Sequence, residues 1–333
     1  MAGIAWTANG REIVYGGGEP SALWRVHASG GTPEHLPYAA PSASQPSISR
    51  SPQRLVYTWW IVNDNLWRLD TRTGERKMLI GSTSYQSIPQ YSPDWRKIAF
   101  QSDRSGNREV WTCDADGSNC QQITHFDGPI CGTPRWSPDS RWLALDSAKE
   151  GQFEIYVVAA DGGEPRRITN HPSGNVIASW SHDGLWVYST SDRSGQYQTW
   201  KVSKDGGEPV QVTRSGGYAA FESPDGKYLY YDKFSQPGVF RMPAQGGEET
   251  QILQAPPAQQ FRMFAVTSNG VYFSPDAKTI QFFDTAAGKI RTVVALDKAP
   301  VNYCLGVSPD DAYVVWPQRD HSSFSLMLVE GFR

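Results

Sequence analysis

The sequence predicts an all-β chain that folds as a single closed β-propeller of eight blades. Three observations lead to this prediction: a composition rich in bulky strand-forming residues, a unit that recurs about every 43 residues, and four short strands within each unit. Aromatic residues make up 12% of the 333 residues and include 13 Trp and 15 Tyr. This is enough to fill the core of a large β structure.

The repeating unit is an apolar strand, a turn of the type Ser-Pro-Asp, and a second strand. The segment FAVTSNGVYF supplies a hidden copy in a gap of 85 residues, and the out-of-phase SPDA at 274–277 is then a loop inside that copy. Successive anchors lie 42 to 45 residues apart, which is typical of propeller blades, and seven blades is the alternative count. The anchor residues are Thr7, Ser49, Ser92, Ser137, Ser181, Ser223, Ala265 and Ser308.

Each unit contains four strands separated by turns. In the fourth unit the strands are TPRWS, WLALD, EIYVVAA and PRRIT, with Gly, Asp and Ser between them. The eighth unit ends after its third strand, SFSLMLVEGFR, so thirty-one strands are predicted. Either the last blade has three strands, or the chain is the C-terminal fragment of a larger protein whose upstream part holds the closing strand. We favour the fragment, with residues 1–333 as a single propeller domain.

Composition and charge argue against several classes of protein. The formal net charge of −3, from 31 basic and 34 acidic interspersed residues, provides no basic face for nucleic acid. No stretch approaches the roughly 20 apolar residues of a membrane span, and the N-terminus has no signal-peptide pattern. Cys113 and Cys120 flank the turn DADGSN and could form a disulfide across a hairpin. Two reduced cysteines are the alternative, so the redox compartment stays open.

Long phrases of the chain resemble a known family. The phrases PQYSPDWRKIAFQSDRSGNREVWTCDADG, RWSPDSRWLALDSAKEGQFEIYVVAADGGEPRRIT and SHDGLWVYSTSDRSGQYQTWKVSKDGGEPVQVT resemble the Pro-Asp repeats of TolB-type, WD40-like propellers. The segments GGYAAFESPDGKYLYY and LMLVEGFR resemble more narrowly the C-terminal propeller region of bacterial CadC-like winged-helix transcriptional regulators. This resemblance implies an upstream DNA-binding domain, often a transmembrane helix, and a propeller that acts as a sensor or interaction platform on the periplasmic side.

We expect the binding site on the face that carries the second-to-third-strand loops and the connections between blades, around the mouth of the central channel. Segments that differ between repeats are the best candidates, because a ligand breaks the symmetry of its binder. Adjacent tryptophans are typical of a protein-binding hot spot, although they could also cap a blade edge. The candidate residues are Trp59, Trp60, Tyr85, His125, Asp127, His171, Arg319 and His321.

The sequence Ser-Asp-Arg-Ser-Gly occurs twice between second and third strands, at 102–106 and 191–195. Asp103 and Asp192 could bind calcium, and Arg104 and Arg193 could clamp a carboxylate. The alternative is a tight structural loop in which Asp and Ser bond to backbone amides while Arg is solvated. Their recurrence favours the structural interpretation.

The chemistry of the chain favours binding over catalysis. No Gly-x-Ser-x-Gly elbow occurs, and the six histidines include no pair at metal-ligand spacing. We therefore expect a non-enzymatic module that binds a protein or small-molecule ligand, needs no cofactor except possible calcium, and serves signal transduction in a transcriptional regulator. The alternatives are an enzyme, a hydrolase or lyase at the channel mouth with His125 or His171 as base, and a purely architectural scaffold.

Overall fold

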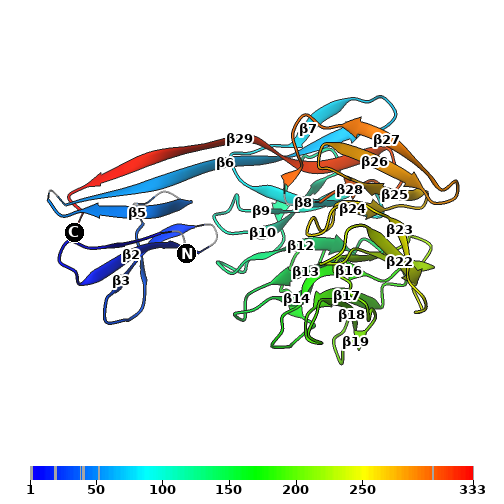
Figure 1. Ribbon diagram of the computed structural model, residues 1–333, viewed down its shortest axis with the longest axis horizontal. Helices are drawn as coiled ribbons and strands as arrows, with labels where there is room; N and C mark the ends of the chain where they lie inside the picture. The colour runs from blue at the N-terminus through cyan, green and yellow to red at the C-terminus, as the bar shows by residue number, and fades with distance from the viewer. Residues whose placement is uncertain are drawn as a thin grey trace.

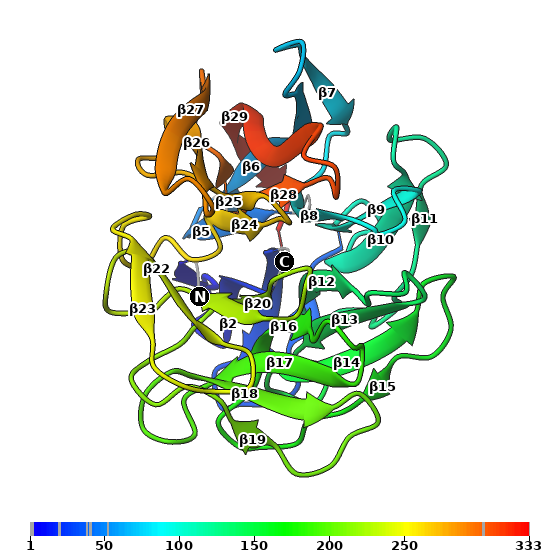
Figure 2. The ribbon, with the colours of Figure 1, turned by 90° about the vertical axis from the view of Figure 1, so that its right-hand side faces the viewer.

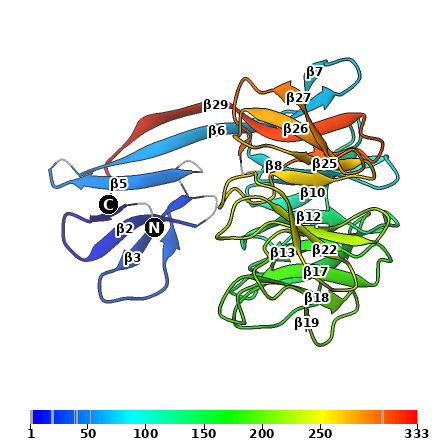
Figure 3. The same cartoon turned by 45° about the vertical axis from the view of Figure 1, so that its right-hand side comes forward.

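The computed structural model consists of β-strands joined by turns and loops (Figure 1). It describes residues 3–18, 21–37, 39, 42–51, 53–301 and 304–332, in which the strands form seven antiparallel sheets. A ring of blades and a smaller arm are joined by a long two-stranded ribbon, made of β6 (Arg54–Asp70) and β29 (Tyr313–Glu330) (Figure 3). Within the described ranges, no helix has the length and hydropathy to cross a bilayer.

Five blades of the ring are four-stranded sheets formed by consecutive stretches of chain, and they are arranged side by side in a circle (Figure 2). Alternating β-branched and aromatic residues form their strands, and Gly, Asp and Ser form the turns. The first three comprise β8 (Gln86–Tyr91), β9 (Lys97–Ser102), β10 (Glu109–Asp114) and β11 (Gln121–Gln122); β12 (Cys131–Trp136), β13 (Trp142–Ser147), β14 (Glu154–Ala159) and β15 (Arg166–Arg167); and β16 (Val176–Trp180), β17 (Trp186–Ser191), β18 (Gln198–Ser203) and β19 (Val210–Gln211). The other two comprise β20 (Ala220–Glu222), β21 (Tyr228–Tyr231), β22 (Val239–Pro243) and β23 (Thr250–Leu253); and β24 (Phe264–Val266), β25 (Gly270–Phe273), β26 (Thr279–Asp284) and β27 (Lys289–Ala295).

The sixth blade of the ring combines strands from both ends of the chain. Its two inner strands are β28 (Gly306–Val307) and the first half of β29, and its two outer strands are the second half of β6 and β7 (Arg76–Ile80). The central pairing places Val314 opposite Leu69 and Trp316 opposite Trp67. We call this sheet the closing blade, because it joins the beginning of the ring to its end.

The arm contains the remaining strands. One sheet is built from β1 (Ile4–Trp6), β2 (Glu12–Gly17), β3 (Ala22–His27) and β4 (Glu34–His35). The other consists of β5 (Ala43–Ser49), the first half of β6 and the second half of β29. The two sheets pack through a cluster that includes Val14, Leu23, Leu55, Tyr57 and Phe332.

The eight predicted repeats are therefore divided between the two bodies, and the predicted single ring of eight blades is not confirmed. Six blades form the ring, and the arm holds the other two sheets, because repeats two and eight exchange strands. The exchange requires β6 and β29 to continue straight through TWWIVNDN and PQRDHSS, where the sequence predicted loops. The described chain has 29 strands, and β6 and β29 each span two of the predicted strands. The SPDA segment lies between β25 and β26, as a loop inside its repeat, as predicted.

Apolar clusters join each ring blade to the next. The closing blade packs on the blade of β8–β11 through Leu66 and Val315, and on the blade of β24–β27 through Leu69 and Trp316. Four further clusters join the other neighbours around the ring. Burial of each large side chain contributes roughly 1.5 to 3 kcal/mol, so these interfaces supply much of the cohesion of the ring.

The Ser-Pro-Asp turns share one hydrogen-bond pattern. In the turn between β12 and β13, the Ser137 Oγ donates to Asp139 Oδ1 at 2.5 Å and accepts from the Trp142 backbone N at 2.9 Å. Asp139 Oδ1 also accepts from the Arg141 backbone N at 3.1 Å. The repeat is therefore conserved within the chain because these side chains close the hairpin between the first and second strands.

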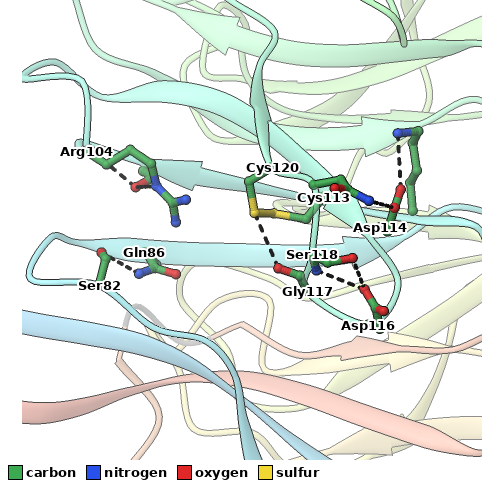
Figure 4. The surroundings of a disulfide bond; sticks show 12 residues. Ser82, Gln86, Arg104, Cys113, Asp114, Asp116, Gly117, Ser118 and Cys120 are labelled. Atoms are coloured by element: carbon green, nitrogen blue, oxygen red, sulfur yellow. Dashed lines mark hydrogen bonds and ion pairs between the residues drawn. A yellow bond between two sulfur atoms is a disulfide. The ribbon is translucent and has the colours of Figure 1, made fainter.

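The structure contains a disulfide between Cys113 and Cys120 (Figure 4). Cys113 is at the buried end of β10, and Cys120 directly precedes β11, so the bond spans the hairpin that joins these strands. It borders the core between this blade and the closing blade. The other two cysteines, Cys131 and Cys304, are buried thiols.

Candidate functional site

A pocket of about 380 Å³ lies at the mouth of the central channel, on the ring face of the Ser-Pro-Asp turns (Figure 2 views the ring along its axis). All six ring blades contribute to it with the ends of their first strands and the turns that follow. We call it the turn-face mouth. Its principal aromatic and aliphatic lining residues are Tyr91, Trp136, Trp180, Phe221, Phe264 and Leu305.

Hydrogen bonds between blades fix the indole rings of this mouth. The Trp136 Nε1 donates to the Gln90 carbonyl at 3.1 Å, and the Trp180 Nε1 donates to the Arg135 carbonyl at 3.0 Å. The Gln90 side chain in turn accepts from the Trp136 backbone N at 2.8 Å. Both indoles thus satisfy their one polar atom on the preceding blade, and their apolar surface is left for packing and for the pocket wall.

Polar groups break the symmetry of the mouth on one side. The Glu222 carboxylate accepts from the His182 backbone N at 2.7 Å and from the Tyr188 hydroxyl. Burial and the adjacent Glu222 carboxylate raise the pKa of Tyr188 well above its ordinary value, so the hydroxyl remains a donor at neutral pH. His182 occupies the place of the proline found in the neighbouring turns.

Arg135 extends a buried charge into the mouth from β12. Only 7% of this residue is exposed, and its guanidinium carbon lies 4.7 Å from the centroid of the Phe221 ring. Burial lowers the pKa of Arg135 to about 10, and repulsion by Arg262 acts in the same direction. The guanidinium remains protonated at neutral pH.

Two buried aspartates connect neighbouring blades close to these arginines. Asp146 Oδ2 accepts from the Thr133 hydroxyl at 2.6 Å and from the Ile177 backbone N at 2.8 Å. Asp232 accepts from the Ala219 backbone N at 2.7 Å and from the Arg262 backbone N at 2.9 Å. Burial raises the pKa of Asp146, and it raises the pKa of Asp232 to about 6.

The residues predicted as a site lie elsewhere, and they do not form one cluster. None of them lines the turn-face mouth. Tyr85 and Asp103 are neighbours, because the Tyr85 backbone N donates to Asp103 Oδ1 at 2.8 Å. Burial raises the pKa of Asp103. His171 and Arg193 line a second pocket of about 550 Å³ at the rim of the ring.

The two Ser-Asp-Arg-Ser-Gly loops have a structural arrangement in common. The Arg104 and Arg193 guanidinium carbons lie 5.0 and 4.8 Å from the ring centroids of Trp111 and Trp200 on the adjoining third strands. Each arginine Nε also donates to the first serine of its loop at 3.2 Å. Arg193 therefore packs on its own blade, and Asp192 beside it is exposed. Calcium binding by these loops stays a prediction.

Buried glutamates position the connections that carry the two candidate histidines. Glu109 accepts from the Asp127 backbone N at 3.1 Å, and Glu154 accepts from the His171 backbone N at 2.7 Å. His125 and Asp127 themselves are exposed. The His171 Nδ1 accepts from the Ser173 backbone N at 3.0 Å. Among the described residues, no group of three or more His, Cys, Asp or Glu side chains could hold a metal ion.

The remaining candidates lie on the ribbon that joins the ring to the arm. The Trp60 Nε1 donates to Ser44 Oγ at 3.1 Å, and the ring is 41% exposed; its neighbour Trp59 is half-buried against the arm core. Arg319 pairs with the buried Asp64 at 2.8 Å, which bridges β29 and β6. His321 is exposed on β29, and its Nε2 lies 2.9 Å from Ser323 Oγ.

Comparison with known proteins assigns the fold to a family. Residues 121–301, more than half of the chain, match the family described as the TolB beta propeller domain. The chain belongs to the TolB beta propeller domain family. A curated, uncharacterized protein of Agrobacterium fabrum is 30% identical over 107 residues, which is 31% of this TolB-type chain and 36% of that protein. The chain thus matches about a third of the length of this relative.

Solved structures share the fold of this TolB-type propeller at low identity. The putative TolB from Agrobacterium tumefaciens has a TM-score of 0.65 and 21% identity, over 78% of this chain and 99% of that one. TolB from Acinetobacter baumannii has a TM-score of 0.54 and 16% identity, over 94% and 77%. A puromycin hydrolase has a TM-score of 0.51 and 15% identity, over 90% and 54%. At these identities the likeness concerns the fold, which serves unrelated functions.

Proposed function

We propose that this propeller is a non-enzymatic protein-binding module whose partner inserts a short segment into the turn-face mouth. The observation that supports this proposal is the lining of the mouth, where six blades present aromatic and aliphatic side chains beside a few polar groups. Such concave, largely apolar surfaces with buried aromatic anchors are typical of binding hot spots. The polar side formed by His182 and Glu222 gives the mouth an orientation that a symmetric ring would lack.

The positions of the candidate bases favour binding over catalysis. His125 and His171 lie outside the lining of the mouth, and the one histidine that lines it, His182, is exposed at its rim. Glu222 engages its two oxygens with the His182 backbone N and the Tyr188 hydroxyl. A general base must lie within hydrogen-bond reach of the proton it abstracts, with a free acceptor. The mouth thus offers packing and hydrogen bonds rather than an acid–base pair.

We also propose that this module is the sensory part of a CadC-like transcriptional regulator and works on the periplasmic side of the membrane. The proposal rests on the segments GGYAAFESPDGKYLYY and LMLVEGFR. The sequence of the complete gene tests it. A winged-helix domain encoded upstream would support the proposal, and a gene with no such domain would refute it.

The binding proposal is tested by panning a random peptide library against the purified chain. Ser268 is an exposed residue at the rim of the mouth, so Ser268→Trp fills the opening without a change in the core. Ser194 is exposed on a second-to-third-strand loop outside the mouth, so Ser194→Trp is the matched control. We expect the enriched peptides to bind the wild type and Ser194→Trp with equal affinity. They should not bind Ser268→Trp. Equal binding to all three proteins, or no enrichment, would contradict the proposal.

A further inference from the structure

The arm carries a strand edge that no other strand of the described chain covers. The second half of β29 continues into the arm and pairs there with β6, on one side only. β28 pairs with Val314 and Val315, which belong to the ring. Figures 1 and 3 show the second half of β29 along the outer edge of the arm, on the side away from β2 and β3. We call residues 322–329 of β29 the arm edge.

The position of this edge in its sheet specifies what would fit it. In the ring blades and in the sheet of β1–β4, a fourth strand covers the third. In the other sheet of the arm, β5, β6 and β29 take the first three positions, and no described strand takes the fourth. The free side of a third strand presents a row of backbone N–H and C=O groups, which an extended strand satisfies. The occupant that fits is therefore a β-strand.

The other edges of the structure are protected against such pairing. β11, β15, β19 and β23, the outer strands of four ring blades, span two to four residues each. β7 and β27 are longer, but each carries two basic side chains. The opposite edge of the same arm sheet, β5, contains Pro46, which has no N–H to donate. Short strands, charges and proline all discourage pairing with other chains. The arm edge, SSFSLMLV, has eight residues, with no charge and no proline.

The arm edge also exposes a row of large apolar side chains. Phe324, Leu326 and Leu328 are 64%, 73% and 53% exposed, and they lie on one face because alternate residues of a strand point the same way. Trp60, opposite Phe324 on β6, continues this face, with the two ring centroids 5.4 Å apart. Two of the residues between them pack on the arm core. Pairing of the edge would remove part of this apolar surface from water, which favours association.

We propose that the arm edge pairs with the arm edge of a second copy of this chain, antiparallel and centred on Leu326. In this register Leu326 faces Leu326 of the second copy, and Phe324 faces Leu328 of the second copy. The segment is thus complementary to itself, since apolar side chains meet apolar side chains on the same face. The nearest acidic residue, Glu330, is already paired with Arg54 of its own chain at 2.9 Å.

The pairing would join the two three-stranded arm sheets into one sheet of six strands. Because the described chain has one such edge, a two-fold axis through the pair uses both edges and closes the assembly as a dimer. The inference concerns the arm, so it does not depend on the function proposed for the turn-face mouth.

Sedimentation velocity of the full chain over a concentration series tests the proposal. Leu326→Lys places two lysines opposite each other across the two-fold axis. Val210→Lys is the matched control, because Val210 is 47% exposed on β19, the outer strand of a ring blade. We expect the wild type and Val210→Lys to dimerise equally, and Leu326→Lys to associate at least about tenfold more weakly. Both replaced side chains are exposed, so circular dichroism should show an unchanged fold.

Cysteine variants test the register of the pair. Under mild oxidation Leu326→Cys should form a disulfide between two copies, because the two positions face each other. Phe324→Cys should not, because the two copies of position 324 lie four residues apart along the paired strands. A wild type that stays monomeric throughout the series would overturn the proposal and leave the edge to a strand of another protein. Dimers that Leu326→Lys does not weaken, or that Phe324→Cys links and Leu326→Cys does not, would overturn it as well.

Discussion

The strand pairing in the closing blade leads to a prediction about one buried leucine on β6. Its truncation should destabilise strands that lie far along the chain. Leu66 on β6 is fully buried and packs against Ile80, Phe100 and Val315, which come from three separate parts of the chain. Leu66→Ala should cost roughly 3 kcal/mol, within the 2 to 5 kcal/mol found for leucine truncation in a core. For a body of this size, that corresponds to a fall in melting temperature of roughly 6 to 12 °C.

Hydrogen exchange measured by mass spectrometry provides the assay, because it separates the ring from the arm. Leu66→Ala should increase exchange in β28 and in the first half of β29, although these strands are more than 230 residues distant in sequence. Leu23→Ala is the matched control, since Leu23 is equally buried but belongs to the arm core. It should increase exchange in the arm and leave the ring unchanged. Unchanged protection of β29 in Leu66→Ala would refute the closing blade.

Three further predictions concern the ribbon, the channel and the turns. Cysteines replacing Ile61 and Ser323, which lie opposite each other, should form a disulfide detectable on a non-reducing gel, whereas blades closed separately by repeats two and eight would keep them apart. The pKa of Asp232 is raised by burial to about 6 from 3.8, so between these values the folded state holds a proton that the unfolded state has lost; stability should fall by about 3 kcal/mol as pH rises from about 3 to 7, and urea titrations should show no such fall in Asp232→Asn. Ser137→Ala removes the hydroxyl that closes a turn and should cost about 1 to 2 kcal/mol in urea unfolding, and an unchanged midpoint would contradict the role given to these turns.

The repeat and its strands could be predicted from the sequence, because each hairpin is closed by local side chains. The seventh repeat illustrates this locality: the Thr267 backbone N bonds to Gly270 O, whereas the Ser223 backbone N bonds to Tyr228 O five residues on. Its turn is two residues shorter, so the anchor counted back from its second strand falls at Ala265. Strand partners could not be predicted in the same way, because the alternation of apolar residues shows which face of a strand is buried but does not specify the strand that pairs with it.

The candidate site was harder to predict for a related reason. Tyr91, Trp136 and Trp180 precede the repeated turns, whereas the prediction favoured segments that differ between repeats. Their side chains serve packing and also line the mouth, so recurrence did not separate the two roles. Arg135 belongs to no motif, and only the folded ring brings it against Phe221 of another blade. The prediction based on unlike loops found residues that are spread over the rim and the ribbon.

The mixed origin of the closing blade also sets the timing of folding during synthesis. The second half of β6 and β7 leave the ribosome before the strands that complete their sheet, β28 and the first half of β29, which follow more than 220 residues later. Hydrogen bonds such as that from Asn65 to Asp320 at 2.7 Å, across 255 residues of sequence, cannot form until β29 has been made. Until then the nascent ring has an unpaired edge, which is open to pairing with other chains. Ribosome stalling between β27 and β28 should therefore leave a chain that aggregates, although five complete ring blades are already made.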